Sequence, residues 1–197
     1  MGKPQETKII IISGPSGAGK TTLLKKIFLR PLIKKNFILA VSYTTRMKRK
    51  QEKEGRDYFF VSKEQFHRLI KKKFFLEYQK VLNDYYGTPR YFLKEAQKKR
   101  RDLILCIDVK GGMYLKKRIK KDKIVTIFIG VPTQGELSRR LRKRGDSKII
   151  KKRIALAKKE LQFAKVYDYL IINQNLQSAL KLLERVLITE RLQRRRQ

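Results

Sequence analysis

The residues between positions 14 and 21 have the types and spacing needed to bind a polyphosphate. They fit the pattern Gly-x-x-x-x-Gly-Lys-Ser/Thr at every fixed position. The segment consists of Gly14, Pro15, Ser16, Gly17, Ala18, Gly19, Lys20 and Thr21, with Thr22 following. Glycines let the backbone curl until several N–H groups point at one anion. In this pattern Lys20 reaches the β- and γ-phosphates and the Thr21 hydroxyl is a ligand of Mg²⁺, so the sequence predicts a nucleoside triphosphate site.

This chemistry needs a strand before the loop and a helix after it. Residues 8–13 form a β-branched run typical of a buried strand, and residues 22–28 have the pattern of a helix. The helix N-terminus adds partial positive charge beside the phosphates. A chance glycine-rich match is the alternative, but it does not explain why both elements stand on the required sides.

Four polar side chains further along the chain could surround a second phosphate group. The guanidinium groups of Arg46 and Arg49 are rigid donor forks that pair with phosphate oxygens. The hydroxyls of Tyr58 and Tyr86 can donate to the same group. Taken singly, the arginines are better explained as surface charges and the tyrosines as packing residues of a small sheet.

The Glu77 carboxylate could recognise a nucleobase by accepting hydrogen bonds from it. An ionised carboxylate only accepts hydrogen bonds, and it matches two adjacent N–H donors, which guanine offers at N1 and its 2-amino group and adenine does not. A site of this kind rejects the wrong base because a buried carboxylate would be left unpaired. Taken alone, Glu77 could instead balance the charge of nearby lysines.

The order of these residues resembles the nucleotide-monophosphate lobe of guanylate kinases. The resemblance is carried there by Ser42-Tyr43-Thr44-Thr45-Arg46-Met47-Lys48-Arg49, Glu52, Gly55, Asp57-Tyr58, Glu77 and Tyr86-Gly87-Thr88. It continues through Ile107-Asp108, Arg140, Arg144-Gly145, Arg153, Tyr167-Asp168-Tyr169 and Asn173. Such a set after a phosphate loop is highly specific, and it favours a shared role for residues that are ambiguous one by one.

The resemblance implies transfer of the γ-phosphoryl group of ATP to GMP, and to dGMP, with Mg²⁺. It implies a GMP site made of Ser42, Arg46, Arg49, Glu52, Tyr58, Glu77, Tyr86, Thr88 and Asp108. Within that site Ser42 and Thr88 would face the O6 and N7 side of guanine, and Asp108 would hold the water shell of Mg²⁺ or face the base. The catalytic set would be Lys20, Arg46, Arg49 and the lid arginines Arg140, Arg144 and Arg153, while Asn173 would contact ATP. Because phosphoryl transfer is mostly positioning and charge neutralisation, no side chain needs to act as a nucleophile.

Short apolar runs alternate with helical patterns over most of the chain. We expect strands at residues 36–41, 103–107, 124–129 and 169–172, and helices at 91–99, 112–119, 134–144, 149–166 and from 176. This predicts an α/β fold of the P-loop NTPase type, with a parallel sheet flanked by helices. Residues 42–90 differ, with short strands at 58–61, 74–78 and 85–88, and a capping-box start from Ser62 to Gln65. We therefore expect one domain, with a core at 1–41 and 91–197, an inserted mixed or antiparallel GMP-binding lobe at 42–90 and a helical lid at about 138–156.

The composition limits the kinds of metal site, cellular location and partner that the protein can have. The 197 residues include one cysteine, Cys106, which excludes a thiolate metal cluster, and one histidine, His67, expected on a helix surface. No stretch is apolar and long enough to span a membrane, and the first residues lack the apolar segment of a signal peptide, so we expect a cytoplasmic protein. The net charge of +34 is spread over nearly every segment, which favours solvated helix faces over a nucleic-acid partner. Monomer and homodimer both stay open.

The sequence leaves three alternatives to the kinase function. A catalytically dead interaction scaffold of the same family would usually have a damaged phosphate loop, whereas Lys20 and Thr21 are present. A related kinase acting on a phosphorylated sugar would have no base for Glu77 to read. A nucleic-acid-binding protein is suggested by the net charge alone.

Overall fold

The computed structural model describes residues 7–143 and 150–193, and its centre is a parallel sheet of five strands. The strands are β1 (Ile9–Ser13), β2 (Phe37–Leu39), β7 (Asp102–Cys106), β8 (Ile124–Gly130) and β9 (Tyr169–Ile172). Their order across the sheet is β2-β7-β1-β8-β9, and every pair is parallel. The sheet confirms the α/β prediction, and β1 lies at its centre with the phosphate loop at its carboxyl end.

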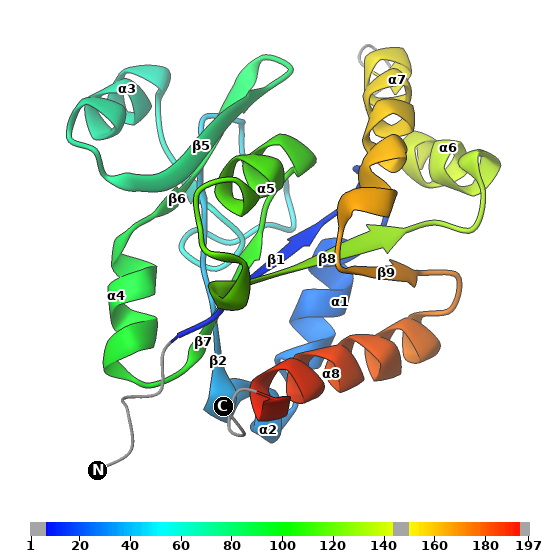
Figure 1. The fold of residues 1–197 in the computed structure, drawn as a ribbon. Coiled ribbons are helices and arrows are strands. Elements are labelled where there is room, and N and C mark those ends of the chain that lie inside the picture. The colour runs from blue at the N-terminus through cyan, green and yellow to red at the C-terminus, as the bar shows by residue number, and fades with distance from the viewer. Residues whose placement is uncertain (1–6, 144–149, 194–197) are drawn as a thin grey trace.

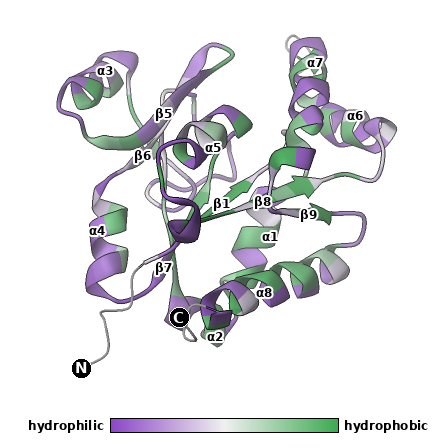
Figure 2. Cartoon of the chain, viewed as in Figure 1, coloured by the Kyte–Doolittle hydropathy of each residue, from purple (hydrophilic) through white to green (hydrophobic). Residues whose placement is uncertain are grey.

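Helices cover both faces of this sheet, because β1 is apolar on both of its sides. Ile10 and Ile12 pack with α1 (Lys20–Ile27), α2 (Pro31–Asn36) and α8 (Leu176–Gln193) on one face. Ile9 and Ile11 pack with α4 (Tyr91–Lys98) and α5 (Val109–Lys116) on the other. The central strands are correspondingly hydrophobic in Figure 2, and the outer helices carry hydrophilic faces. The predicted strand–loop–helix around the glycines is therefore confirmed.

A second sheet lies within residues 42–90, the segment in which the sequence predicts an inserted lobe, and we call this segment the lobe. It holds a four-stranded sheet made of β3 (Tyr43–Thr44), β4 (Phe59–Phe60), β5 (Phe75–Val81) and β6 (Asp84–Pro89), and one helix, α3 (Lys63–Lys71). The sheet is mixed, since β3 and β4 are parallel and the other pairs antiparallel. The expected capping box is present at Ser62, whose hydroxyl accepts from the Gln65 N–H at 3.1 Å. Phe66 of α3 stacks on Phe75 with ring centroids 4.5 Å apart, so aromatic packing forms the core of this lobe.

The lid carries α6 (Gln134–Arg142) and α7 (Ile150–Leu161), and Figure 1 shows it across from the lobe, beyond the carboxyl end of the sheet. The predicted helix over 149–166 is wrong at its end, because α7 stops at Leu161 and a 3-10 helix, η3 (Gln162–Val166), follows. Apolar Phe163 and Val166 suggested a longer helix, but their side chains are exposed. The predicted break between the lid helices at Gly145–Ser147 lies outside the described residues.

The helix expected at 112–119 also begins earlier than predicted. It is α5, which runs from Val109 to Lys116, because Asp108 caps it and its carboxylate accepts from the Gly111 N–H at 2.9 Å. The capping places Asp108 at the carboxyl end of β7, beside the phosphate loop. The other expected ranges agree with observed helices and strands to within a few residues, whereas α2, β3 and a 3-10 helix, η1 (Lys121–Lys123), were not predicted.

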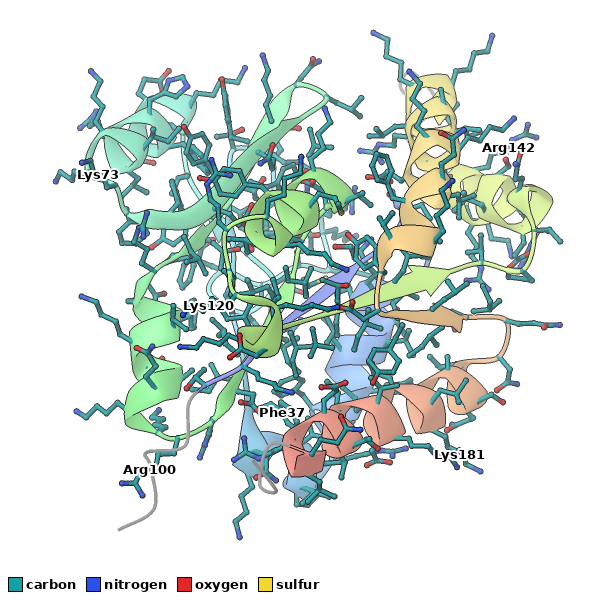
Figure 3. All side chains as sticks on the ribbon, viewed as in Figure 1. Phe37, Lys73, Arg100, Lys120, Arg142 and Lys181 are labelled. Carbon is teal, nitrogen blue, oxygen red and sulfur yellow. The ribbon has the colours of Figure 1, made fainter. Side chains whose placement is uncertain are left out.

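Basic side chains extend from every part of the fold. Figure 3 labels Lys73 of the lobe, Arg100 after α4, Arg142 of the lid and Lys181 of α8, and these exposed side chains point outward in different directions. His67 is exposed on α3, as predicted. Within residues 7–143 and 150–193, no helix is long and apolar enough to cross a membrane. The cytoplasmic location, the oligomeric state and the absence of nucleic-acid binding stay predictions.

Candidate active site

The phosphate loop, the lobe and the lid line one cleft of about 940 Å³. The predicted residues on its wall are Gly14, Ser16, Gly17, Gly19, Lys20, Thr21, Thr22, Ser42, Arg46, Arg49, Glu52, Tyr58, Glu77, Tyr86, Asp108 and Arg153. Residues that are up to 139 positions apart in the sequence therefore share one cavity (Gly14 to Arg153). Pro15 and Ala18 are buried within the loop, and Arg144 lies outside the described residues.

The glycines of the phosphate loop are required by its geometry. Gly14, Gly17 and Gly19 have φ values of 141°, 90° and 88°, which L side chains rarely adopt. A Cβ on Gly14 would lie 2.1 Å from the carbonyl oxygen of Ile129 in β8. The loop is therefore pressed against the neighbouring strand, and only glycine fits there.

Lys20 begins α1 and lies inside the loop. Its ammonium group donates to the carbonyl oxygens of Gly14 and, at 3.1 Å, of Pro15. Thr21 follows with an exposed side chain on the cleft wall. The helix N-terminus, the ammonium group and the hydroxyl thus converge on the same end of the cleft, as a bound triphosphate requires.

Arg46 is oriented by a carboxylate. Its Nη1 and Nη2 atoms donate to the two oxygens of Glu52 at 3.0 and 2.9 Å, and the Arg49 N–H donates to the same carboxylate at 2.9 Å. Burial opposes ionisation of Glu52, but the hydrogen bonds from Arg46 and Arg49 lower its pKa below the ordinary value. Glu52, predicted as a GMP contact, is placed by the structure as the group that holds both arginines.

The two predicted tyrosines lie beside this pair. The Arg46 guanidinium stands over the Tyr58 ring at 5.4 Å, and the rings of Tyr58 and Tyr86 meet edge-on at 6.0 Å. Burial raises the pKa of the Tyr58 hydroxyl, so it stays protonated and remains a donor. The structure therefore gathers Arg46, Arg49, Tyr58 and Tyr86, which we call the phosphate clamp, on one wall of the cleft.

Glu77 is buried deeper in the lobe. The Thr88 hydroxyl donates to one of its oxygens at 2.7 Å, and the Ser42 and Thr88 hydroxyls lie 3.2 Å apart. Burial raises the pKa of Glu77 to about 7, and the hydrogen bond from Thr88 offsets part of that rise. A Cβ on Gly111 of α5 would lie 2.7 Å from the carboxylate, so α5 closes this end of the pocket. The three residues expected to face guanine are therefore joined through the Thr88 hydroxyl.

Asp108 is half-buried on the wall of the cleft, and desolvation raises the pKa of its carboxyl group. One oxygen caps α5, as described above, and the residue also lines the cleft with Thr21. Mg²⁺ bound by nucleotides takes few protein ligands and keeps waters and phosphate oxygens. One hydroxyl and one nearby carboxylate fit that need, although the described residues hold no group of three or more His, Cys, Asp or Glu side chains able to bind a metal.

Arg140 and Asn173 line a second, smaller cavity of about 360 Å³ on the other side of the phosphate loop. The Asn173 amide donates to the Ala18 carbonyl at 2.8 Å, and Arg140 donates to the Asn173 carbonyl at 3.0 Å. Arg140 also donates to Glu136 at 2.7 Å. The structure thus separates two predicted lid arginines, with Arg140 beside this cavity and Arg153 on the main cleft.

Several residues on the cleft wall were not predicted. They are Lys25, Lys50, Asp57, Cys106, Lys143, Lys152 and Glu160. Burial raises the pKa of Glu160 to about 7 and also raises that of the Cys106 thiol. The lysines gave no sequence signal because basic residues are abundant throughout the chain.

Comparison with known proteins agrees with this geometry. The guanylate kinase family model matches residues 6–190. The chain is 39% identical over 191 residues to a guanylate kinase of Wolbachia pipientis wMel, covering 96% of this chain and 93% of the relative. It is 41% identical over 190 residues to one of Carboxydothermus hydrogenoformans, covering 95% and 91%. The crystal structure of guanylate kinase from Anaplasma phagocytophilum superposes with a TM-score of 0.77 at 29% identity, covering 96% of this chain and 88% of that one. Since the family model matches most of the chain and the two relatives align over nearly all of it, the chain belongs to the guanylate kinase family.

Proposed function

We propose that this guanylate kinase transfers the γ-phosphoryl group of ATP to GMP, and to dGMP, in the cleft between the core, the lobe and the lid. The observation that carries the proposal is a buried carboxylate, Glu77, in the same cavity as a phosphate clamp and an intact phosphate loop. These three features match the base and phosphate of GMP and the triphosphate of ATP.

The donor half binds ATP. Backbone N–H groups of the phosphate loop and the Lys20 ammonium group surround the β- and γ-phosphates, and Asn173 and Arg140 mark the cavity for the adenine side. Thr21 would ligate Mg²⁺ and Asp108 would hold one of its waters. Bound there, Mg²⁺ neutralises part of the charge on the phosphates.

The acceptor half binds GMP. Arg46, Arg49, Tyr58 and Tyr86 donate to its phosphate. Glu52 orients the guanidinium of Arg46 and holds the backbone N–H of Arg49. The ionised Glu77 accepts from N1 and the 2-amino group, while the Ser42 and Thr88 hydroxyls serve the O6 and N7 side. Adenine lacks this pair of donors, which gives the site its selectivity.

In the transfer step a phosphate oxygen of GMP attacks the γ-phosphorus of ATP. The bond from that phosphorus to the β–γ bridging oxygen breaks, and ADP leaves with the electron pair. Lys20 and the lid arginines Arg144 and Arg153 stabilise the charge on the transferring group. Arg140, predicted for the same role, stands instead at the smaller cavity, where it donates to Glu136 and to the Asn173 carbonyl. Closure of lid and lobe excludes water, which would otherwise accept the phosphoryl group.

A comparison of acceptors tests the proposal. In a coupled assay of ADP release with ATP and Mg²⁺, GMP and dGMP should give far higher kcat/KM than AMP, UMP or CMP. Glu77→Gln should lose most of that preference, whereas Glu54→Gln, a change at an exposed carboxylate of the same lobe, should keep it. Equal turnover of AMP and GMP would contradict the guanine assignment, and no turnover of any nucleotide would favour an interaction scaffold.

A further inference from the structure

An ion pair joins the donor half of the cleft to the acceptor half. The Lys25 ammonium group of α1 contacts the Asp57 carboxylate of the lobe. Lys25 lies five residues after Lys20 on the helix that the phosphate loop begins, and Asp57 directly precedes Tyr58 of the phosphate clamp. Both side chains line the main cleft. The contact therefore connects the two segments whose separation sets the distance between donor and acceptor phosphates.

The Asp57 end of this pair is firmly held. Its side chain is only 3% exposed, and the carboxylate accepts from the Lys53 N–H at 3.0 Å and from the Arg56 guanidinium at 3.1 and 3.0 Å. Burial opposes its ionisation, but the hydrogen bonds from Lys25, Lys53 and Arg56 lower its pKa overall. Asp57 thus presents a fixed negative charge to the Lys25 ammonium group, which crosses from the core.

The other contacts of Asp57 remain within the lobe, since Lys53 and Arg56 belong to the same loop. They keep the loop in shape without fixing its position relative to α1. Lys25 differs from them because it stands on the core. A buried acceptor paired across two parts of a fold costs more to break than an exposed pair, since the remaining charge is left without its partner.

We propose that the Lys25–Asp57 ion pair sets the position of the phosphate clamp relative to the phosphate loop, which makes Lys25 and Asp57 positioning residues for phosphoryl transfer. The inference rests on the proposed function of the cleft. It assigns neither side chain a bond to the reacting atoms.

This role has a distinct kinetic consequence. The groups that bind GMP lie within the lobe and those that bind ATP lie on the core and lid, so each nucleotide keeps its own contacts when the pair is lost. Only their mutual alignment is lost, and a misplacement of about 1 Å can cost up to about a hundredfold in rate. We expect Lys25→Met to lower kcat about tenfold while the KM values for GMP and ATP change little.

Two variants separate this effect from a general loss of charge. Lys26→Met makes the same substitution at the next residue of α1, which is exposed, and should leave kcat unchanged. Lys25→Arg keeps a cation within reach of Asp57 and should restore most of the wild-type kcat. A fall in kcat equal for Lys25→Met and Lys26→Met, or no fall for Lys25→Met, would overturn the proposal.

A double-mutant cycle separates positioning from direct binding of substrate by Lys25. Asp57→Asn alone should reproduce the loss of kcat, and the double variant should be no worse than the worse single variant. If Asp57→Asn leaves kcat intact, or if Lys25→Met mainly raises the KM of either nucleotide, Lys25 acts directly and the proposal is wrong.

A distance measurement tests the link without relying on activity. Spin labels on Lys71→Cys in the lobe and Arg185→Cys in α8, in a Cys106→Ala background, report the separation of lobe and core. Both label positions are exposed. Lys25→Met should broaden or shift the distance distribution of the nucleotide-free protein, and Lys26→Met should not. An unchanged distribution overturns the inference, whereas a wild-type protein that fails to phosphorylate GMP contradicts the proposed function and leaves this readout valid.

Discussion

The donor and acceptor halves of the cleft hold phosphate by different physical means. The donor half depends on backbone geometry, because Gly14, Gly17 and Gly19 adopt positive φ and Gly14 lies against the Ile129 carbonyl of β8. The acceptor half uses side chains, which are held by one another: Glu52 orients Arg46, and Thr88 bridges Ser42 and Glu77. Eight consecutive residues specify the first site, whereas the second is gathered from residues 42–88 across a mixed sheet.

This difference shows why the two halves respond differently to substitution. A backbone site depends on few side chains, so a single lysine carries much of its electrostatic effect. A side-chain site is a network, in which removal of one partner leaves another buried and unpaired. The four predictions below test this contrast.

The largest effect is expected at the donor half. Lys20→Ala removes the ammonium group beside the transferring phosphate, so kcat should fall about 10²- to 10³-fold, as on loss of one preorganised electrostatic donor. GMP should still bind, because its contacts lie in the lobe. Coupled assays of ADP release and calorimetric titration of GMP measure the two quantities. A variant that keeps most of the wild-type kcat would show that the backbone alone suffices.

A smaller effect is expected when the acceptor network loses its organiser. Glu52→Gln removes the charge that holds Arg46 and Arg49, and each hydrogen bond to a charged group contributes about 1.5–3 kcal/mol, so the KM for GMP should rise about tenfold or more. The KM for ATP should stay near the wild-type value. Steady-state kinetics with each nucleotide varied in turn provides the measurement, and a matching rise in both KM values would contradict the separation of the halves.

Ionisation of Glu77 should make GMP binding sensitive to pH near neutrality. Its pKa is raised to about 7 in the folded protein, so the carboxyl group takes up a proton as the pH falls through that value and loses its acceptor character. GMP affinity should therefore fall about tenfold between about pH 8 and about pH 6, and binding near neutral pH should release a proton. Calorimetry in two buffers detects the proton.

The phosphate of GMP also titrates, with a pKa near about 6, so a reference protein is needed. In Glu77→Gln the contributions of the phosphate and of Glu160, whose pKa is also raised to about 7, should remain, so the difference between the two profiles isolates Glu77. Identical profiles would contradict ionisation of Glu77 as the requirement for base binding.

The smallest effect is expected for DNA binding driven by the net charge, because the basic residues are not concentrated in either half of the cleft. Basic side chains are spread over the whole surface (Figure 3), so duplex DNA should bind only weakly above ~0.15 M salt. Fluorescence anisotropy over a salt series measures this. Submicromolar affinity at that salt concentration would restore the nucleic-acid hypothesis.

Much of the fold was predictable because its elements carry local signals. The β-branched run at 8–13, the capping box at Ser62 and the alternation of strands with helices each gave elements near their observed bounds. The errors arose where local pattern and packing disagree. The predicted helix continued to Val166, but α7 ends at Leu161, and the apolar side chains of Phe163 and Val166 are exposed. Asp108 caps α5, so this helix begins at Val109, three residues before the predicted start.

The sequence alone determined the chemistry of the phosphate loop, because contiguous residues specify its backbone geometry. It also indicated the residue types of the acceptor site, through the order in which they occur. Only the tertiary structure decided which partners those residues have. It assigned Glu52 to the arginines, placed Arg140 and Arg153 at different cavities and paired Lys25 with Asp57. The physical reason is that an ion pair or a buried carboxylate depends on distances between separate elements, and those distances are set by how the lobe, the lid and the sheet pack.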